Sequence, residues 1–369
     1  MNIKVIHYIP TIDKNSGGIG SYIQLLSKEL GKLADLHIIT HKSDYMLNIE
    51  NATIHFIEGN LLHFFKMRSQ FFELLNIINP NIVHINCCWY PQCSLVQKWS
   101  QEKGYKTILS PHGMLEPWVL EKNHWLKKVP ALLLYQKKAI KQAEILIATA
   151  NTEKQNLINL GYNNNVCIIP NGIIIDGINS KNTWDKKKII LFLALLRPNK
   201  GAHILIEAIA LLKNSLIDWR VIIAGKGDKD YTKYLNKLIQ KHKLEKIVSL
   251  PGPIFGNEKW DMFRNSDIFV LPTLHENFGI VIAESLLCGT PVITCQGAPW
   301  EGLIKNKCGW WIERTPESIA NTIKKAINLN ENELKSMGIR GREYIIKNFS
   351  SNLIAKQMLN MYMQVIYKS

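Results

Sequence analysis

The sequence predicts an α/β protein built from two doubly wound domains in tandem. Its 369 residues exceed the usual size of one hydrophobic core, so two domains are expected. Short apolar segments alternate with amphipathic segments, which is the pattern of parallel sheets covered by helices. A polar, lysine-rich stretch at residues 176–187 separates two such series and is interpreted as a linker.

The first series predicts a domain over residues 1–172. It opens with a strand at Lys4–Ile9 and a helix at Gly20–Leu33. Further strands are predicted at Leu36–Thr40, Ile82–Asn86, Thr107–Ser110, Ile145–Ala148 and Val166–Ile169. The series ends at Pro170-Asn171-Gly172, where the character of the chain changes.

The second series predicts a domain over residues 173–350, followed by an amphipathic helix at Ser351–Tyr367 within the terminal segment 351–369. Its strands are predicted at Ile189–Ala194, Arg220–Ala224, Ile247–Leu250, Ile268–Leu271 and Pro291–Thr294. In doubly wound sheets, ligands bind where the carboxyl ends of the strands face a crevice. We therefore search for functional residues directly after strands.

Charge and cysteine content exclude several classes of protein. The net charge of +15 favours anionic partners, but the excess is spread over both halves, so nucleic acid is not an expected partner. Seven cysteines without a C-x-x-C pair indicate neither a disulfide framework nor a zinc site. No signal-peptide core and no run of 18 apolar residues occur, so we expect a cytoplasmic protein.

Two turns offer groups that suit phosphate. The segment Ser16–Gly20 lies between the first strand and helix, where Gly18 would let a ligand approach the backbone; a flexible turn is the alternative. The G-x-G-x-x-G fingerprint is not met, which disfavours NAD.

After a strand of the second series, Arg197 and Lys200 flank a tight turn and suit a diphosphate, although they could be solvated loop charges.

A third motif, Glu276–Glu284, follows another strand and leads into a helix. Backbone amides of Phe278, Gly279 and Ile280 would form a phosphate cradle at the helix N-terminus. Glu284 lies among apolar residues and needs strong partners, which ribose hydroxyls would supply. A structural glutamate paired with a lysine is the alternative.

His112, in Ser110-Pro111-His112-Gly113-Met114, follows a strand of the first series. A histidine there can donate to a sugar or phosphate oxygen or move a proton, but it can also be structural.

Asp228 and Asp230 could hold a divalent cation, yet they stand in a polar turn without a third carboxylate. We predict no metal site and no cofactor.

Together these motifs resemble the retaining glycosyltransferase family 4 (glycosyl transferases group 1). The resemblance covers nearly the whole chain and rests on the ordered set of Arg197/Lys200, Glu276 with Glu284, Ile169–Gly172 and Cys288–Val292. It implies the GT-B fold, in which two Rossmann-like domains face a central cleft and the last helix returns to the first domain.

The resemblance also implies roles for individual residues. Arg197 and Lys200 would bind the donor diphosphate and stabilise the leaving group. Glu276, with Asn277 beside it, would contact the donor sugar, the amides of Phe278, Gly279 and Ile280 would hold its phosphates, and Glu284 would hold the ribose. Gly18 would close over the diphosphate, and His112 would lie near the transferred sugar. We expect retention by attack on the same face, because no nucleophile is placed for a covalent intermediate.

The resemblance favours an enzyme of bacterial surface-polysaccharide synthesis, acting on O-antigen, capsule or exopolysaccharide with a UDP- or GDP-linked donor. The segment Gly297–Glu301 is similar to that group; Trp300 could touch substrate or only pack. Residues 118–142 and 63–72 mix aromatic, apolar and basic side chains and suit an acidic membrane with a lipid-linked, polyprenyl-diphosphate acceptor, or ordinary surface helices. The rival functions are a nucleotide-sugar epimerase, a phosphorylase and an inactive nucleotide-sugar-binding partner.

Overall fold

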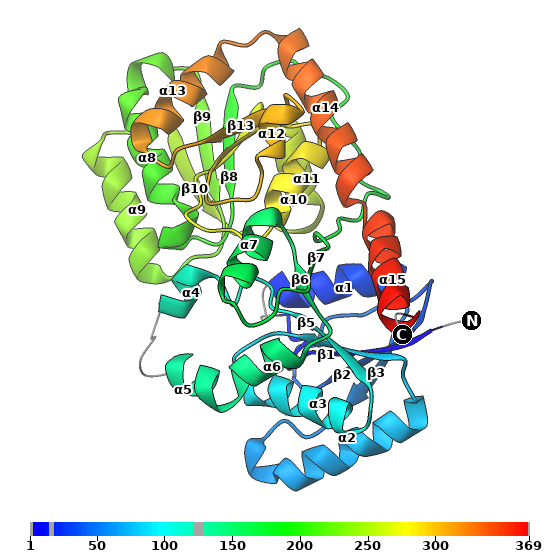
Figure 1. Cartoon of the computed structure of the whole chain (residues 1–369). Helices are drawn as coiled ribbons and strands as arrows, with labels where there is room; N and C mark the ends of the chain where they lie inside the picture. Colours follow the sequence, from blue (N-terminus) through cyan, green and yellow to red (C-terminus); the bar gives the residue numbers. More distant parts are fainter. Residues whose placement is uncertain (1–2, 15–17, 122–127, 368–369) are drawn as a thin grey trace. The chain divides into compact units, whose positions relative to one another are not determined.

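The computed structural model describes residues 3–14, 18–121 and 128–367. The chain forms two compact units (Figure 1). Unit 1 comprises Met1–Gly172 and Ser351–Ser369, and unit 2 comprises Ile173–Ser350. Each unit contains one parallel sheet with helices on both faces, so the predicted fold class of two Rossmann-like domains is confirmed.

Unit 1 holds a seven-stranded parallel sheet with the order β3-β2-β1-β4-β5-β6-β7. Its strands are β1 Lys4–Tyr8, β2 Asp35–Thr40, β3 Thr53–Phe56, β4 Ile82–Asn86, β5 Lys106–Ser110, β6 Ile145–Ala148 and β7 Val166–Ile168. Its helices are α1 Gly18–Leu30, η1 Leu61–His63, α2 Phe64–Ile78, α3 Pro91–Glu102, α4 Pro117–Glu121, α5 Val129–Ala131, η3 Leu132–Gln136, α6 Lys137–Gln142, α7 Asn151–Asn159 and α15 Ser351–Tyr367. The strand order reverses between β1 and β4, which places the ligand crevice of this sheet at their carboxyl ends.

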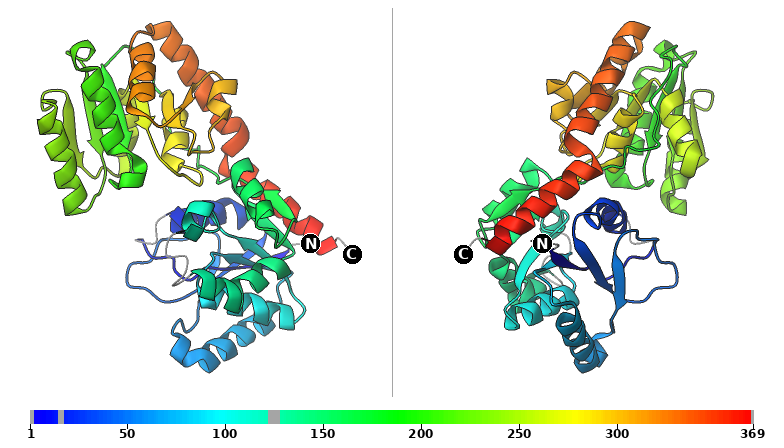
Figure 2. Two further views of the ribbon diagram at one scale, coloured as in Figure 1. Left: turned by 60° about the vertical axis from the view of Figure 1, so that its left-hand side comes forward. Right: turned by 90° about the vertical axis from the view of Figure 1, so that its right-hand side faces the viewer.

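Alternating side chains of the central strands of unit 1 fill two separate cores. Val5 of β1 and Ile82 of β4 face the core beneath α1 and α15. Ile6 of β1 and Val83 of β4 face the core beneath α2, α3 and α6. Because both faces are covered, every residue of β4 and all residues of β1 except Lys4 are buried. The helices on each side of the unit 1 sheet can be followed in Figure 2.

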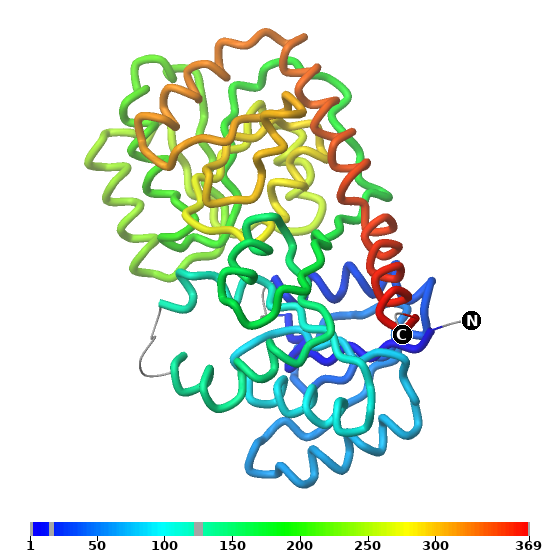
Figure 3. The backbone as a smooth tube through the Cα atoms, viewed as in Figure 1, coloured from blue at the N-terminus to red at the C-terminus, as the bar shows by residue number. Residues whose placement is uncertain are grey.

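The terminal helix α15 belongs to unit 1 although the preceding helix belongs to unit 2. Its buried side chains recur every three or four residues, as an amphipathic helix requires: Ile354, Ala355, Met358, Met361, Tyr362 and Val365. They pack with α1 against the sheet. The backbone trace in Figure 3 follows this return of the chain, in red, to the unit that contains its N-terminal strand.

Unit 2 holds a six-stranded parallel sheet with the order β10-β9-β8-β11-β12-β13. Its strands are β8 Ile189–Leu193, β9 Arg220–Ala224, β10 Val248–Gly252, β11 Ile268–Leu271, β12 Val292–Cys295 and β13 Gly309–Ile312. Its helices are η4 Pro198–Lys200, α8 Ala202–Leu211, η5 Lys213–Ser215, α9 Lys229–Lys241, α10 Gly256–Asn265, α11 Ile280–Leu287, α12 Gly302–Lys305, α13 Pro316–Ile327 and α14 Glu331–Phe349. Here the order reverses between β8 and β11, which marks the crevice of the second sheet.

The structure differs from the predicted elements at a few places. The first helix runs over Gly18–Leu30 instead of Gly20–Leu33. Where the structure describes the segment predicted as one amphipathic stretch, it forms the short helices α4, α5, η3 and α6. Trp125, Leu126 and Lys127 of that segment, and Ser16 and Gly17 of the glycine-rich turn, lie outside the described residues. The edge strands β3 and β13 were not predicted, because their partly exposed residues lack the long apolar run of central strands.

Candidate functional site

In unit 2, the loops that follow β8 and β11 bring two of the predicted residues together. Lys200 lies in the loop after β8 and Glu276 in the loop after β11, on the two sides of the strand-order reversal. The Lys200 ammonium donates to the Glu276 carboxylate, with the two side chains 20% and 16% exposed. The pair thus holds a cation and an acceptor carboxylate, still accessible, at the crevice of the sheet.

Arg197 precedes η4, the short helix that carries Lys200, and is exposed. Among the residues that the structure describes, no hydrogen bond or ion pair occupies its guanidinium, which therefore remains available to an anion. The turn that carries Arg197 ends at Gly201, whose φ of +80° is left-handed and whose added Cβ would stand 2.1 Å from the carbonyl oxygen of Pro272. The loop after β8 therefore packs closely against the backbone just after β11.

Arg314 was not found by sequence reasoning, and it fastens the same two loops. Its Nε donates to the Pro272 carbonyl at 2.8 Å and its Nη2 to the Pro198 carbonyl at 3.3 Å. The amide of Leu274 adds a 2.7 Å bond to the Asn199 carbonyl. An arginine that reaches two distant carbonyls has no local sequence signal, since its partners are brought together only by the sheet.

The N-terminus of α11 is the place where the amides of Phe278, Gly279 and Ile280 are predicted to hold phosphate. Gly279, the N-cap, has φ +79°, and the first amides of α11 precede its regular hydrogen-bond ladder. The Ile282 amide, in the same turn, donates to the Gly279 carbonyl at 2.9 Å. Phe278 is buried beneath this turn, with its ring centroid 5.3 Å from that of Trp300. Trp300 is 1% exposed and its Nε1 donates to the Phe278 carbonyl, so it packs beneath the loop. Asn277 is on the same loop and is also engaged within the structure.

Glu284 is buried within α11 and pairs with a lysine. Its carboxylate accepts a 2.6 Å bond from Lys259 of α10. Burial raises the pKa of Glu284, and the adjacent ammonium opposes that shift. This contact is the one expected for a structural glutamate, so its predicted ribose contact remains a proposal.

The two aspartates considered as cation ligands have other roles. Asp228 is the N-cap of α9, where its carboxylate accepts a 2.7 Å bond from the Tyr231 amide. Asp230 lies in the first turn of the same helix. Within the described ranges, no three His, Cys, Asp or Glu side chains are grouped so that they could hold a metal ion.

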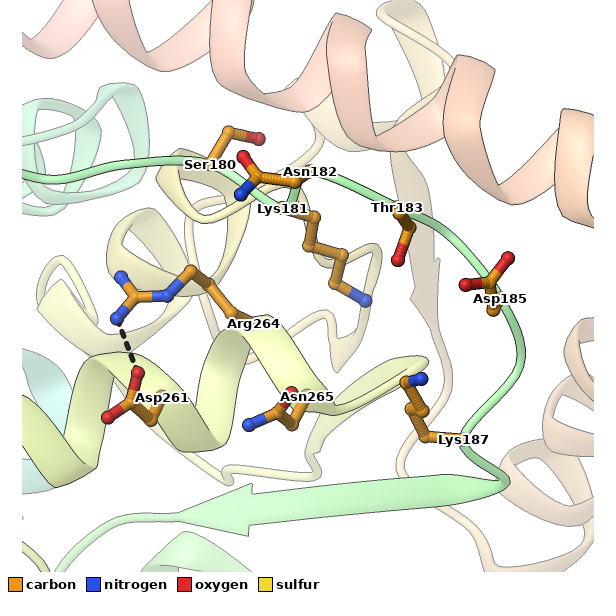
Figure 4. Close-up of a pocket in the computed structure, with 9 residues that line it drawn as sticks. All are labelled: Ser180, Lys181, Asn182, Thr183, Asp185, Lys187, Asp261, Arg264 and Asn265. Atoms are coloured by element: carbon orange, nitrogen blue, oxygen red, sulfur yellow. Dashed lines mark hydrogen bonds and ion pairs between the residues drawn. The ribbon is translucent and has the colours of Figure 1, made fainter.

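A polar pocket of about 230 Å³ lies at the other edge of the unit 2 sheet. Its lining includes Lys187 and Asn265, which precede β8 and β11, whereas the candidate site follows those strands. Figure 4 shows Arg264 paired with Asp261 on α10 and Lys181 extending from the linker. Lys181 donates to the Ser266 carbonyl, and burial lowers its pKa to about 8. These cations already have internal partners, so the pocket is separate from the candidate site.

In unit 1, the predicted residues Gly18 and His112 follow β1 and β5, at the carboxyl edge of the sheet. Gly18 begins α1, and nothing lies within 4 Å of its added Cβ. His112 has φ +52°, an uncommon value for a residue other than glycine, and its ring centroid is 4.4 Å from that of Tyr22. Its Nε2 lies 3.4 Å from Oδ1 of Asn86. Burial lowers the pKa of His112 to about 4, so the imidazole is neutral at pH 7.

Glu153, also missed from the sequence, supports the His112 loop. Its buried carboxylate accepts bonds from the Gly113 amide at 2.6 Å and from the amide and hydroxyl of Thr149 at 2.7 and 2.8 Å. An acidic residue in the first turn of a helix was the available signal, because such residues often accept from nearby backbone amides. Glu153 thereby joins the loops that follow β5 and β6.

Exposed apolar side chains stand beside lysines on the segments considered for membrane contact. Leu133 and Leu134 are 74% and 79% exposed and precede the exposed Lys137. On α2, Phe65 is 82% exposed beside Lys66. Among the described helices, none combines the length and apolar character needed to cross a bilayer.

Two family models match the chain in succession. Residues 16–176 match Glycosyltransferase Family 4, and residues 175–344 match Glycosyl transferases group 1. The chain belongs to the family 4 and group 1 glycosyltransferases. The candidate residues of unit 1 and unit 2 thus lie in the segments that match these two models.

Individual relatives agree with this assignment. WcaL of Salmonella typhimurium, named for colanic acid biosynthesis, is 26% identical over 180 residues, which are 47% of this chain and 44% of WcaL. Matches to the first curated relatives cover 43–45% of their length. Sucrose-phosphate synthase from Thermosynechococcus elongatus has a TM-score of 0.79 at 19% identity, covering 99% of this chain and all of that one. HepE from Anabaena, solved with UDP and glucose, has a TM-score of 0.76 at 16% identity. That match covers 98% of this chain and 100% of the HepE chain. These structures share the fold.

Proposed function

We propose that this glycosyltransferase moves a sugar from a nucleotide-diphosphate donor to a hydroxyl of a glycan acceptor, with retention of anomeric configuration. The observation that carries the proposal is in unit 2. Lys200, the accessible Arg197 and Glu276 gather on both sides of the strand-order reversal, next to the N-terminus of α11. Two cations and a helix N-terminus suit a diphosphate, and a carboxylate beside them suits sugar hydroxyls.

The donor would replace contacts that the structure now makes internally. A diphosphate that draws the Lys200 ammonium would release the Glu276 carboxylate, which is then free to accept from sugar hydroxyls. Arg197 reaches the same anion without breaking a contact with a described residue. Amides of Gly279 and Ile280 bind its oxygens, and Glu284, with Lys259 as its present partner, accepts from the ribose.

Catalysis then consists mainly of charge stabilisation and positioning. As the bond to the diphosphate breaks, Arg197, Lys200 and the α11 dipole stabilise the negative charge on the leaving group without a metal ion. The acceptor hydroxyl attacks from the face that the diphosphate leaves, and the leaving phosphate takes its proton. From unit 1, we assign His112 to the transferred sugar and Gly18 to the diphosphate. A neutral imidazole suits His112, since it can both donate and accept.

The donor and the pathway rest on similarity to named proteins. HepE was solved with UDP-glucose, which makes a UDP-linked sugar our first choice, ahead of a GDP-linked one. WcaL is named for colanic acid biosynthesis, which supports a role in bacterial surface polysaccharide. We further propose a lipid-linked acceptor, reached at an acidic membrane surface through the exposed apolar and basic side chains of α2, η3 and α6. We accordingly propose that the enzyme acts at the inner face of the cell membrane.

The test combines donor binding with turnover. Thermal unfolding is measured with UDP, GDP and their sugar conjugates, and hydrolysis or transfer of the bound sugar is measured with the donor that binds. Glu276→Gln is compared with Glu245→Gln, a matched change at an exposed glutamate before β10. We expect the first variant to lose at least 100-fold in turnover, a magnitude typical of groups that contact the reacting centre, and the control to be unaffected.

The alternatives give different outcomes. A nucleotide-sugar epimerase would convert the donor without any acceptor, and a phosphorylase would require inorganic phosphate. An inactive binding partner would bind nucleotide with no turnover. Binding of no nucleotide sugar, or full turnover by Glu276→Gln, would contradict the proposed site.

A further inference from the structure

A continuous chain of buried polar side chains lies beneath α15 in unit 1. Tyr362 of α15 places its hydroxyl 2.8 Å from Nε2 of His7 and 2.6 Å from Nδ1 of His84. The other nitrogen of His84, Nε2, is 2.7 Å from the hydroxyl of Ser110. His7 and His84 are paired neighbours on β1 and β4, and all four residues are at most 1% exposed. Each of these deeply buried polar side chains has a hydrogen-bond partner, as buried polar groups normally require.

Asn86, at the end of β4, connects this chain to His112. Its Nδ2 lies 3.3 Å from the Tyr8 carbonyl and 3.4 Å from the His84 carbonyl, and 3.1 Å from Nδ1 of His7. Carbonyl oxygens can only accept, so they orient the amide with its NH₂ toward them. The amide oxygen then faces Nε2 of His112 at 3.4 Å and must accept from it.

The orientation of Asn86 sets the direction of every other hydrogen bond. His7 accepts at Nδ1, so as a neutral ring it carries its proton on Nε2 and donates to Tyr362. Tyr362 must then donate to Nδ1 of His84, which carries its proton on Nε2 and donates to Ser110. If every bond ran in the opposite direction, His7 would carry its proton on Nδ1, and that N–H would point at the NH₂ group of Asn86.

We propose that Tyr362 of the C-terminal helix is a positioning residue for His112, acting through His7 and Asn86. The chain of hydrogen bonds keeps His112 in the Nε2–H tautomer, with Nδ1 as its only acceptor for a substrate hydroxyl. This inference rests on the proposed role of His112 near the transferred sugar. In this proposal α15 does more than pack against the sheet of unit 1: through Tyr362 it also orients His112.

Two further features agree with positioning by this network. His112 holds a left-handed backbone conformation, φ +52°, which persists only where its surroundings enforce it. The ionisable groups that face His112 are His7 on β1, Tyr22 on α1 and His84 on β4. Burial lowers the pKa of both histidines, to about 3 for His7, so these neighbours are neutral at pH 7.

The tautomers can be measured without any assay of activity. Long-range ¹H–¹⁵N spectra of ¹⁵N-labelled histidines separate protonated from bare ring nitrogens. At pH 7 we expect His7, His84 and His112 all to be neutral with the proton on Nε2. A proton on Nδ1 of His7 or His84, or a charged ring, would overturn the proposed direction of the chain. This test uses the intact protein, so it holds even if variants fail to fold.

Tyr362→Phe tests the positioning role, with Tyr367→Phe as its matched control. Tyr367 lies on the same helix and is 60% exposed. We expect Tyr362→Phe to lower kcat by about 10- to 100-fold, the cost of a displaced catalytic group, with the donor KM changed less than about twofold. The ¹⁵N signals of His112 should shift as well. A variant with reduced thermal stability but unchanged kcat and unchanged His112 signals would leave Tyr362 purely structural and refute the proposal.

Asn86→Asp gives a separate readout in the pH profile. A carboxylate within hydrogen-bond distance raises the pKa of His112, so activity in this variant should fall as the pH drops through a range where the wild type is constant. An unaltered profile would count against the link through Asn86. If the wild type shows no transfer at all, the proposed function fails while the spectra still decide whether the network has the stated direction.

Discussion

Mild acid should destabilise unit 1 through its buried neutral histidines. The pKa of His7 is lowered to about 3 and that of His112 to about 4, in both cases chiefly by burial. A histidine of the unfolded chain has a pKa near 6.5. Between these values the unfolded state binds more protons than the folded state, so stability is complete above pH 6.5 and falls as the pH decreases.

The size of the effect follows from the pKa differences. Each such histidine removes about 1.4 kcal/mol of stability per pH unit below 6.5, so at pH 5 each has cost about 2 kcal/mol. His7 and His112 together therefore cost about 4 kcal/mol, and His84, whose pKa lies well below 6.5, adds to this. A domain has only about 5–15 kcal/mol of stability in total. Buried Glu153 acts in the opposite direction, because its raised pKa favours the folded state at lower pH.

Urea unfolding from pH 8 to pH 5 measures this dependence, and pulsed hydrogen exchange localises it. Peptides of β1 and β4 should lose protection on acidification before peptides of β8 and β11, because unit 2 has no comparable group of fully buried histidines among its described residues. The result that refutes the reasoning is a flat stability profile, or equal loss of protection in the two sheets.

Two further substitutions probe the loops of the candidate site. Glu153→Gln keeps the shape of the side chain but turns an NH₂ group toward a backbone amide such as that of Gly113, which should cost about 1–3 kcal/mol in urea unfolding and reduce turnover. An unchanged unfolding midpoint would contradict this account. Gly201→Ala adds a Cβ 2.1 Å from the Pro272 carbonyl, whereas Gly252→Ala has a similar φ of +93° with nothing within 4 Å. The first should therefore weaken nucleotide binding and stability beyond the second, and equal effects would show that only backbone strain matters.

The central strands of both sheets could be predicted from sequence because each is a short, mainly apolar run that is largely buried. Ile82–Asn86, Ile145–Ala148, Arg220–Ala224 and Ile268–Leu271 have the predicted bounds. Edge strands such as Gly309–Ile312 have one hydrogen-bonded neighbour and partly exposed residues, so their pattern resembles that of a loop. The errors therefore lie where burial is incomplete, which is where periodicity carries least information.

The candidate site was predictable to the extent that its residues follow strands directly. Lys200 and Glu276 were expected at one crevice, and the structure brings them into contact. Arg314 and Tyr362 could not be found in that way, since each acts on residues that are more than 40 positions away in the chain. Their partners are brought within reach only when the sheets have formed.

The two units solve the problem of burying polar groups in opposite ways. In unit 2, Lys200 neutralises Glu276 and Lys259 neutralises Glu284, so charges remain charged and an anionic donor can compete for the cations. In unit 1, burial keeps His7 uncharged, and its hydrogen bonds, including the one to Tyr362, fix which ring nitrogen carries the proton. Salt should therefore weaken donor binding to unit 2, because ions screen accessible charges, while the histidine tautomers of unit 1 stay unchanged. A salt titration followed by both nucleotide affinity and ¹⁵N histidine shifts separates the two, and tautomers that follow the ionic strength would show that the network is open to solvent.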